Sequence, residues 1–196
     1  MPRDDLPVQA FDSQESWEAW LAEQHAASPG LWLKIAKKGP GSTAASGTVS
    51  YAEAIEGALC FGWIDGQKGK LDDEHWLQRF TPRKPGSKWS RINREKAERL
   101  IADGRMKPAG LGQVAAARAD GRWDVAYEPQ STSTVPPDLA RELELNPVAG
   151  AFFATLTGVN RYAILYRIQD VKTPEARARR IAKYVAMLAE HKTIYP

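Results

Sequence analysis

The sequence predicts an α+β protein in which a small mixed α/β N-terminal half, with a short antiparallel sheet, is followed by an all-helical C-terminal half. Two observations lead to this prediction. Extended apolar segments occur at residues 31–35, 63–65 and 75–80, all before the middle of the chain. Every periodic segment after residue 90 instead has the apolar spacing of a helix.

The first elements are predicted from capping residues and helix breakers. Asp12, with a glutamate three residues later, fits the start of a helix over residues 13–26, which ends before the Pro-Gly at residues 29–30. A strand is expected at residues 31–35. Residues 39–42, Gly-Pro-Gly-Ser, are expected to form a flexible loop.

A helix and a hairpin are predicted next. Ser50 and Glu53 form a capping box at the start of the helix, and Gly62 is its expected end. An extended segment follows. Asp65-Gly66 is a turn signal within it, which predicts a hairpin with a return strand near residues 75–80.

The remaining segments indicate helices separated by loops. Residues 81–88 hold two prolines and a glycine and are expected to be a loop, after which Ser90 caps a helix to about Ala102. Another helix is expected at about residues 111–119. Asp-Gly-Arg follows both helices, which is typical of a helix stop and not of an internal repeat. Further helices are expected to begin near Pro137, Pro147, Tyr162 and Thr173.

One candidate linker divides the chain. The polar run Gln130–Thr134 has no core-forming residue, so residues 126–136 are interpreted as a linker. The predicted organisation is an α/β lobe at residues 1–125 and a helical lobe at residues 137–196. The two lobes are expected to pack as one unit.

The composition argues against several classes of protein. A single cysteine, Cys60, allows no intrachain disulfide. Residues 1–10 lack the apolar run of a secretory signal, and no segment has the roughly 20 apolar residues that a membrane span needs. We therefore expect a cytoplasmic protein.

Metal and cofactor sites are not expected. His25, His75 and His191 are widely separated, and the CxxC and HxxxH spacings of metal sites are absent from the sequence. It also lacks a Walker phosphate-binding loop, a dinucleotide fingerprint and a nucleophile elbow. Cys60 lies in an apolar segment, which is typical of a buried and unreactive thiol.

Positive charge is concentrated in one segment. The net charge is only +3, but residues 79–107 hold ten lysines and arginines and three acids. The loop in this segment has no acid, is flanked by aromatic residues and leads into a helix N-terminus, so it is a candidate anion site. The same cations are also typical of a solvated loop. Along the following helix, i,i+4 ion pairs are expected for Arg91–Glu95, Arg94–Glu98 and Glu95–Arg99.

The predicted ligand-binding residues lie mainly around this loop. Phe80 and Trp89 are expected to offer ring faces to a ligand or, alternatively, to anchor the core, and Ser90 is needed as a cap in either case. Arg177 belongs to a second basic group, and is included on the hypothesis that both groups face one cleft. The full set is Trp63, Asp65, Arg79, Phe80, Arg83, Lys84, Ser87, Lys88, Trp89, Ser90, Asn93 and Arg177.

Catalytic residues are only weakly indicated. Asp65 and His75 are the candidates for acid–base chemistry, which requires a geometry that a sequence does not reveal. Asp65 is also typical of the first position of a hairpin turn. The sequence therefore favours a binding protein over an enzyme.

Several motifs together resemble one protein family. They are Tyr51–Ala54, Ala58–Gly66, Arg79–Ser90, Ile92-Asn93, Gly104–Met106, Ala109-Gly110, Asp120–Trp123 and Arg177–Ile181. On these residues the chain is similar, over nearly its whole length, to the bacteriocin-protection, YdeI/OmpD-associated family. The resemblance implies a link to bacteriocin or antimicrobial-peptide resistance, with an indirect connection to an outer-membrane porin. It implies no particular chemistry.

Together these observations favour a non-enzymatic, cytoplasmic protein that binds an anionic small molecule or peptide and contributes to a stress response. Nucleic-acid binding, with cations on phosphates and Trp89 on bases, is one alternative. An enzyme acting on a phosphorylated or acylated small molecule is the other.

Overall fold

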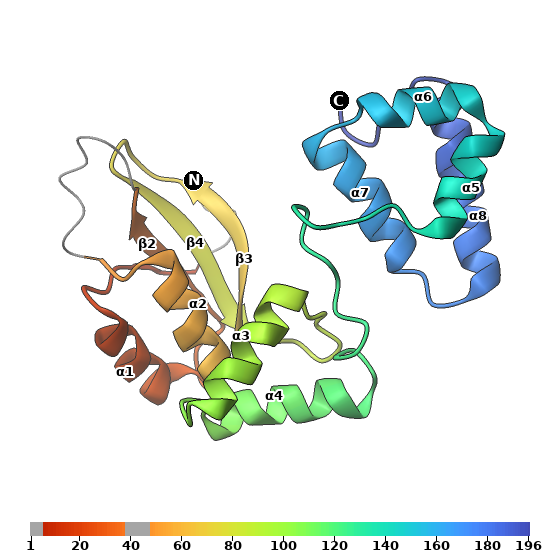
Figure 1. Cartoon of the computed structure of the whole chain (residues 1–196). Helices are drawn as coiled ribbons and strands as arrows, with labels where there is room; N and C mark the ends of the chain where they lie inside the picture. Colours follow the sequence, from red (N-terminus) through yellow and green to blue (C-terminus); the bar gives the residue numbers. More distant parts are fainter. Residues whose placement is uncertain (1–5, 38–47) are drawn as a thin grey trace. The chain divides into compact units, whose positions relative to one another are not determined.

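The computed structural model describes residues 6–37 and 48–196, and its chain divides into two compact units (Figure 1). Unit 1 comprises Met1–Ala126, and unit 2 comprises Tyr127–Pro196. A four-stranded sheet lies in unit 1 and unit 2 is helical, which confirms the α+β prediction. The loop expected at residues 39–42 lies outside the described residues.

The described part of unit 1 combines a sheet with four helices. Its elements are β1 (Val8–Gln9), α1 (Gln14–Gln24), β2 (Leu31–Ala36), α2 (Tyr51–Cys60), β3 (Trp63–Lys70), β4 (His75–Pro82), α3 (Arg91–Ala102) and α4 (Pro108–Ala119). The strand order is β1-β2-β4-β3; β1 is parallel to β2, and the other neighbours are antiparallel. Helices α1 and α2 pack on one face of the sheet, and α3 and α4 pack against α2 (Figure 1).

Aromatic residues form the centre of the unit 1 core. Trp17 of α1, Trp63 of β3 and Phe80 of β4 are each at most 1% exposed. The Trp17 ring lies 5.7 Å from Phe80 and 6.3 Å from Trp63, and its indole N–H donates to the Ala54 carbonyl at 3.0 Å. Burial of large aromatic side chains therefore fixes α1 and α2 on the sheet.

The hairpin has its return strand where the sequence predicts it, but its turn lies elsewhere. Asp65 pairs with Phe80 inside β3, so the prediction of a turn at Asp65-Gly66 is wrong. The chain turns at residues 71–74, where the Asp72 carboxylate accepts hydrogen bonds from the Glu74 and His75 backbone N–H groups at 2.9 and 2.6 Å. The Asp-Gly pair instead lies at the start of a register shift between Asp65 and Lys68, which is a β-bulge.

The side chain of Gln78 supports this bulge. It is fully buried, and its amide nitrogen donates to the carbonyls of Gly66 and Gln67 at 2.8 and 3.3 Å. Carbonyl groups displaced from the strand ladder need such partners when they are buried. A long-range contact, which the local dipeptide does not reveal, therefore decides the path of β3.

Helix boundaries follow the predicted caps with two corrections. The cap of α2 by Ser50 and Glu53 and the cap of α3 by Ser90 are confirmed. Ser13, not Asp12, caps α1, because its hydroxyl accepts from the Ser16 N–H. Helix α4 begins at Pro108, earlier than expected, with proline in the first turn where no N–H is required.

Unit 2 consists of α5 (Pro137–Leu145), α6 (Pro147–Thr155), α7 (Gly158–Gln169) and α8 (Pro174–Ala189). The stripe predicted on the last helix is confirmed, because Ile181, Tyr184, Val185 and Leu188 are all buried. Tyr127 and Glu128, within the segment expected as a linker, contact α7 through the Tyr166 ring and the Tyr162 hydroxyl. No helix in the described part of the chain is long and apolar enough to cross a membrane.

Candidate functional site

The basic loop of unit 1 is a tight turn between β4 and α3. The Ser87 N–H donates to the Lys84 carbonyl and the Lys84 N–H donates to the Ser87 hydroxyl, both at 3.0 Å. Gly86 has a φ of +79°, a conformation that favours glycine. The turn leaves the side chains of Lys84 and Lys88 exposed to solvent.

Arg83 lies beneath this turn and not on the surface. It is only 5% exposed, and its guanidinium carbon lies 3.7 Å from the centre of the Trp89 ring. One of its Nη atoms donates to the Lys88 carbonyl at 3.2 Å. Arg83 therefore holds both ends of the loop, and its buried charge lies against the Trp89 ring.

Three more arginines converge on the same place. The Trp89 ring contacts the Trp123 ring at 4.8 Å, and the Arg118 guanidinium lies 5.1 Å from the centre of the Trp123 ring. Arg94 donates to the Trp123 carbonyl at 3.2 Å, and Arg122 donates to the Ser87 carbonyl at 2.7 Å. We call the set Arg83, Trp89, Arg94, Arg118, Arg122 and Trp123 the Arg–Trp cluster.

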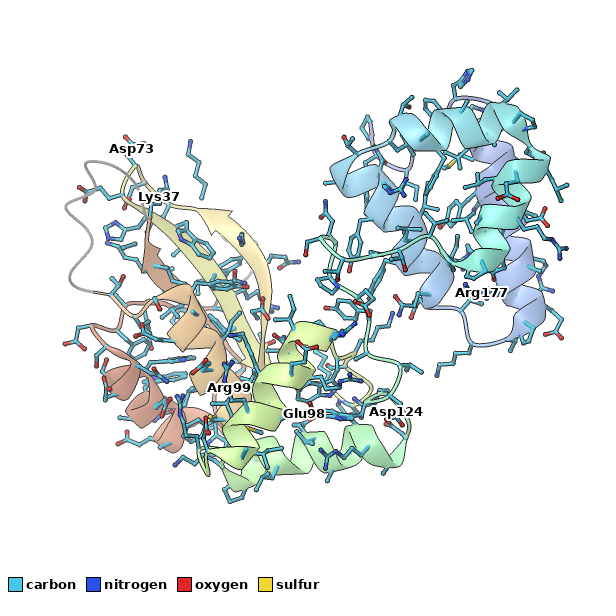
Figure 2. The ribbon with its side chains drawn as sticks, viewed as in Figure 1. Lys37, Asp73, Glu98, Arg99, Asp124 and Arg177 are labelled. Carbon is cyan, nitrogen blue, oxygen red and sulfur yellow. The ribbon has the colours of Figure 1, made fainter. Side chains whose placement is uncertain are left out.

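The charge of the Arg–Trp cluster is only partly balanced. Arg122 is paired with Asp120 at 2.7 Å. Arg94 and Arg118 form no ion pair within residues 6–37 and 48–196. The predicted Arg94–Glu98 pair is therefore wrong, and Glu98, labelled in Figure 2, does not neutralise Arg94. The structure brings together more positive charge here than the loop alone contains.

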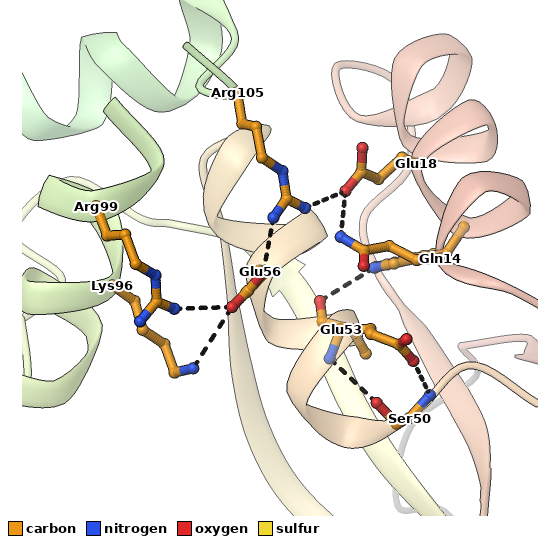
Figure 3. A network of polar contacts seen from close by, with 10 residues as sticks. Gln14, Glu18, Ser50, Glu53, Glu56, Lys96, Arg99 and Arg105 are labelled. Carbon is orange, nitrogen blue, oxygen red and sulfur yellow. Dashed lines mark hydrogen bonds and ion pairs between the residues drawn. The ribbon is translucent and has the colours of Figure 1, made fainter. Parts of the chain in front are cut away.

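Other cations of the basic segment are neutralised away from the loop. Glu56 of α2 accepts from Arg99 and Arg105 at 2.8 Å and lies 3.9 Å from Lys96 (Figure 3). Arg105 also pairs with Glu18 at 3.0 Å. The predicted Glu95–Arg99 pair is wrong, whereas the Arg91–Glu95 pair is present at 2.9 Å. Two acids from distant elements, Glu18 and Glu56, thus pair with three of the ten cations in the segment.

The predicted aromatic ligand contacts are not available. Trp63 and Trp89 are 1% exposed and Phe80 is 0% exposed, so the expectation that Phe80 and Trp89 offer ring faces to a ligand is wrong. The Trp63 indole N–H donates to the His25 carbonyl. These three rings therefore belong to the hydrophobic core of unit 1.

The remaining polar residues of the predicted site are only partly brought together. The Ser90 hydroxyl accepts from the Asn93 N–H at 3.1 Å, so this pair caps α3. Arg79 lies on the opposite face of β4 from Phe80, with its aliphatic part next to Gly66. Ser87 shapes the turn, which leaves Lys84 and Lys88 as the predicted residues best placed to meet a ligand.

Asp65 and His75 do not form one catalytic site. Asp65 accepts a hydrogen bond from the Tyr51 hydroxyl at 2.8 Å. The His75 ring nitrogen lies 3.1 Å from an Asp72 oxygen. Asp65 pairs with Phe80, and His75 is five residues from Phe80 along β4, which separates the two candidates by roughly 16 Å.

Arg177 is a structural clamp in unit 2. Its Nε and one Nη bond to Asp138 at 2.5 and 3.0 Å, and its other Nη donates to the Ile168 carbonyl at 2.9 Å. The hydrogen bond from Arg177 lowers the pKa of the Asp138 carboxyl. Arg177, labelled in Figure 2, therefore joins the first turn of α8 to α5 and to the end of α7.

A pocket of about 480 Å³ adjoins this clamp, a size typical of small-molecule sites. Two acids and two arginines line it, so its charge favours neither anions nor cations. The lining residues are Asp138, Arg141, Glu142, Pro174, Arg177, Ala178, Ile181 and Ala182.

Cys60 and the candidate metal ligands give no reactive centre. Burial raises the pKa of the Cys60 thiol to about 11, with a further increase from the charge of Glu18, so the thiol is protonated at neutral pH. Such a thiol is a poor nucleophile. The described residues contain no group of three or more metal-ligand side chains.

The sequence analysis missed the contribution of residues at the end of α4 and directly after it. Arg118, Arg122 and Trp123 were interpreted only as part of a helix and its stop, and Arg94 as part of a self-paired helix face. The available signal was the aromatic residue directly after Asp-Gly-Arg, which needs a buried partner. Only the tertiary structure identifies that partner as Trp89.

Fold and site together define an α+β protein with a basic Arg–Trp cluster on its sheet-containing unit. Residues 9–113, more than half of the chain, match the model of a domain of unknown function (DUF8412), and the chain belongs to this family. Residues 132–191 match the family described as bacteriocin-protection, YdeI or OmpD-associated. No curated protein and no solved structure matches the chain.

The second match confirms the resemblance, but over residues 132–191 and not over nearly the whole chain as expected. It covers the helical unit, including the motif at Arg177–Ile181. Most of the central motifs lie instead within the domain of unknown function. The helical unit therefore carries the match to the bacteriocin-protection, YdeI or OmpD-associated family, and the sheet-containing unit carries the match to the domain of unknown function.

Proposed function

We propose that this chain is an anion-binding protein and that the ligand docks on unit 1 at the Arg–Trp cluster and the turn above it. The observation that carries the proposal is the convergence of four guanidinium groups around Trp89 and Trp123, two of them on the rings and two on nearby backbone carbonyls. In the described part of the chain, Arg94, Arg118 and Arg122 form a single ion pair, between Arg122 and Asp120. Excess positive charge beside buried rings attracts anions.

The two tryptophans have a supporting role in this proposal. Because Trp89 and Trp123 are buried, they hold the arginines in place and do not stack on the ligand. Preorganised guanidinium groups lose little conformational freedom when a carboxylate or phosphate binds. Arg118, Lys84 and Lys88 are exposed and supply the first contacts with the ligand.

The ligand class is an anionic small molecule or peptide that carries phosphate or carboxylate groups. Guanidinium groups bind both groups through paired hydrogen bonds. We further propose that binding takes place in the cytoplasm and serves resistance to bacteriocins or antimicrobial peptides, on the basis of the family matched by unit 2.

Charge reversal at the turn tests the proposal. The double variant Lys84→Glu, Lys88→Glu changes exposed side chains and leaves the buried arginines intact. We expect it to weaken binding of pyrophosphate and of a phosphorylated peptide by about tenfold or more at low salt, because both charges meet the ligand. Isothermal titration calorimetry at two salt concentrations measures the change.

The matched control is Arg179→Glu, Lys183→Glu on the exposed face of α8, which alters the net charge equally. It is expected to bind as the unmodified chain does. Equal weakening in both variants would show a nonspecific charge effect. Absence of pyrophosphate and phosphopeptide binding in the unmodified chain would refute the proposal.

A further inference from the structure

A second cluster of polar and aromatic side chains lies on the helix-covered face of the sheet. Tyr51 begins α2, Asp65 and Lys68 come from β3, and Trp76 and Gln78 come from β4. Lys68 is paired with Gln78 across the strands, so their side chains emerge on the same face, and Trp76 is two residues along from Gln78. None of these residues belongs to the Arg–Trp cluster.

The rings of Tyr51 and Trp76 are tilted toward one another, and the Lys68 ammonium lies against both; we call this place the Tyr51–Trp76 cleft. Their centroids lie 5.5 Å apart with an angle of 60° between the planes. The Lys68 Nζ lies 4.8 Å from the centre of the Trp76 ring and 5.6 Å from that of Tyr51. Both distances are within the range of cation–π attraction.

A carboxylate borders the cleft. The Asp65 carboxylate accepts the Tyr51 hydroxyl at 2.8 Å, which orients that ring and adds negative charge beside it.

The interactions that keep Lys68 against the two rings are weak. Lys68 is exposed, and within the described residues it forms neither a hydrogen bond nor an ion pair. Its contacts are those with the two rings, which are individually weak at an exposed position. The lysine can therefore leave the cleft at small cost and uncover both ring faces.

We infer that the Tyr51–Trp76 cleft is an ammonium-recognition site that the chain's own Lys68 occupies as an internal competitor. The external ligand it fits is a methylated ammonium group, because methylation spreads the charge over apolar surface that two aromatic walls can cover. The inference is independent of the proposed anion-binding function, since it uses other residues and the opposite sign of ligand charge.

The test removes the competitor. In the full-length Lys68→Gln variant, choline is expected to bind roughly tenfold more tightly than in the unmodified chain if Lys68 fills the cleft about nine tenths of the time. Binding is followed by titration of the Trp76 indole N–H signal in NMR spectra, assigned with Trp76→Phe. Adding Trp76→Ala to Lys68→Gln is expected to abolish binding, which isothermal titration calorimetry measures because this variant lacks the indole signal.

The matched control is Lys70→Gln, which removes a lysine from the same strand without emptying the cleft. Its affinity for choline is expected to equal that of the unmodified chain. The neutral isostere 3,3-dimethyl-1-butanol, of the same shape as choline, is expected not to bind. Equal affinity of Lys68→Gln and Lys70→Gln, or binding of the isostere as tight as that of choline, would overturn the inference.

Discussion

At the scale of single residues, Arg83 decides how the basic loop is built. A cation in a loop with two prolines is usually solvated, but this one is 5% exposed and stacks on Trp89. Burial of an arginine is tolerated when its flat guanidinium covers a ring and its N–H groups reach carbonyls. The same residue therefore has a structural role and contributes positive charge to the site.

Replacing Arg83 with alanine tests the structural role. The change leaves a cavity over the Trp89 ring and removes the hydrogen bond to the Lys88 carbonyl. We expect the free energy of unfolding to fall by about 2–4 kcal/mol. Urea denaturation followed by tryptophan fluorescence measures it.

Lys84→Ala is the control for this prediction, because the neighbouring side chain is exposed. Its effect is expected to stay within about 0.5 kcal/mol. Equal stability of the Arg83 and Lys84 variants would mean that the stack on Trp89 contributes nothing to folding.

At the scale of elements, Glu56 joins three helices and the segment after α3. It accepts from Arg99 of α3 and from Arg105, which also holds Glu18 of α1 (Figure 3). Burial alone would raise the pKa of Glu56, but the hydrogen bond and charge of Arg105, with Lys96 and Arg99, outweigh burial and lower it. The folded chain therefore favours the ionised carboxylate.

Glu56→Gln is expected to destabilise the chain in a pH-dependent way. Because the pKa of Glu56 is lowered on folding, its contribution is fully present above the unfolded value, about 4.3, and is lost as the pH falls through the folded value. We expect a loss of about 1–3 kcal/mol at pH 7 that shrinks toward pH 3. Urea denaturation at both pH values measures it.

The control is Glu98→Gln on the exposed face of α3, which forms no ion pair in the described ranges of the chain. It is expected to change stability little at either pH. A loss for Glu56→Gln that is as large at pH 3 as at pH 7 would contradict the role of its charge.

At the scale of the whole molecule, each unit has its own core. Trp17, Trp63 and Phe80 are central to the core of unit 1, and Leu139 and Ile164 are fully buried in that of unit 2. The boundary falls between Ala126 and Tyr127. The two family matches fall on different sides of this boundary.

We expect each unit to fold when produced alone. Fragments 1–126 and 127–196 should each give dispersed amide signals in NMR spectra and a cooperative urea transition, because each buries a separate core. The shorter fragment should be the less stable, since small domains bury less of their surface.

Fragment 1–120 is the control for the boundary, because it lacks Trp123, the ring that contacts Trp89. It should unfold at lower urea concentration than fragment 1–126. Finding either 1–126 or 127–196 unfolded would show that one unit depends on the other.

Local signals predicted the elements better than their connections. The helix caps at Ser50 and Ser90 and the stripe on α8 are short-range patterns, and all three are confirmed. The turn at Asp65-Gly66 was wrong because Gln78, twelve residues later, satisfies the bulge carbonyls. The candidate site was predicted in part: its loop was identified, but its partners from α3 and from the end of α4 were not.

The sequence by itself determined the α+β class, the main helices and strands, the basic loop and the family resemblance, because these depend on residue spacing and composition. Only the tertiary structure decided which charges remain unbalanced and which rings face solvent. Ion pairing and burial depend on residues such as Glu56 and Trp123, which reach the site from distant parts of the chain. Folding therefore buried the two rings expected to meet a ligand and added arginines that no local pattern assigned to the loop.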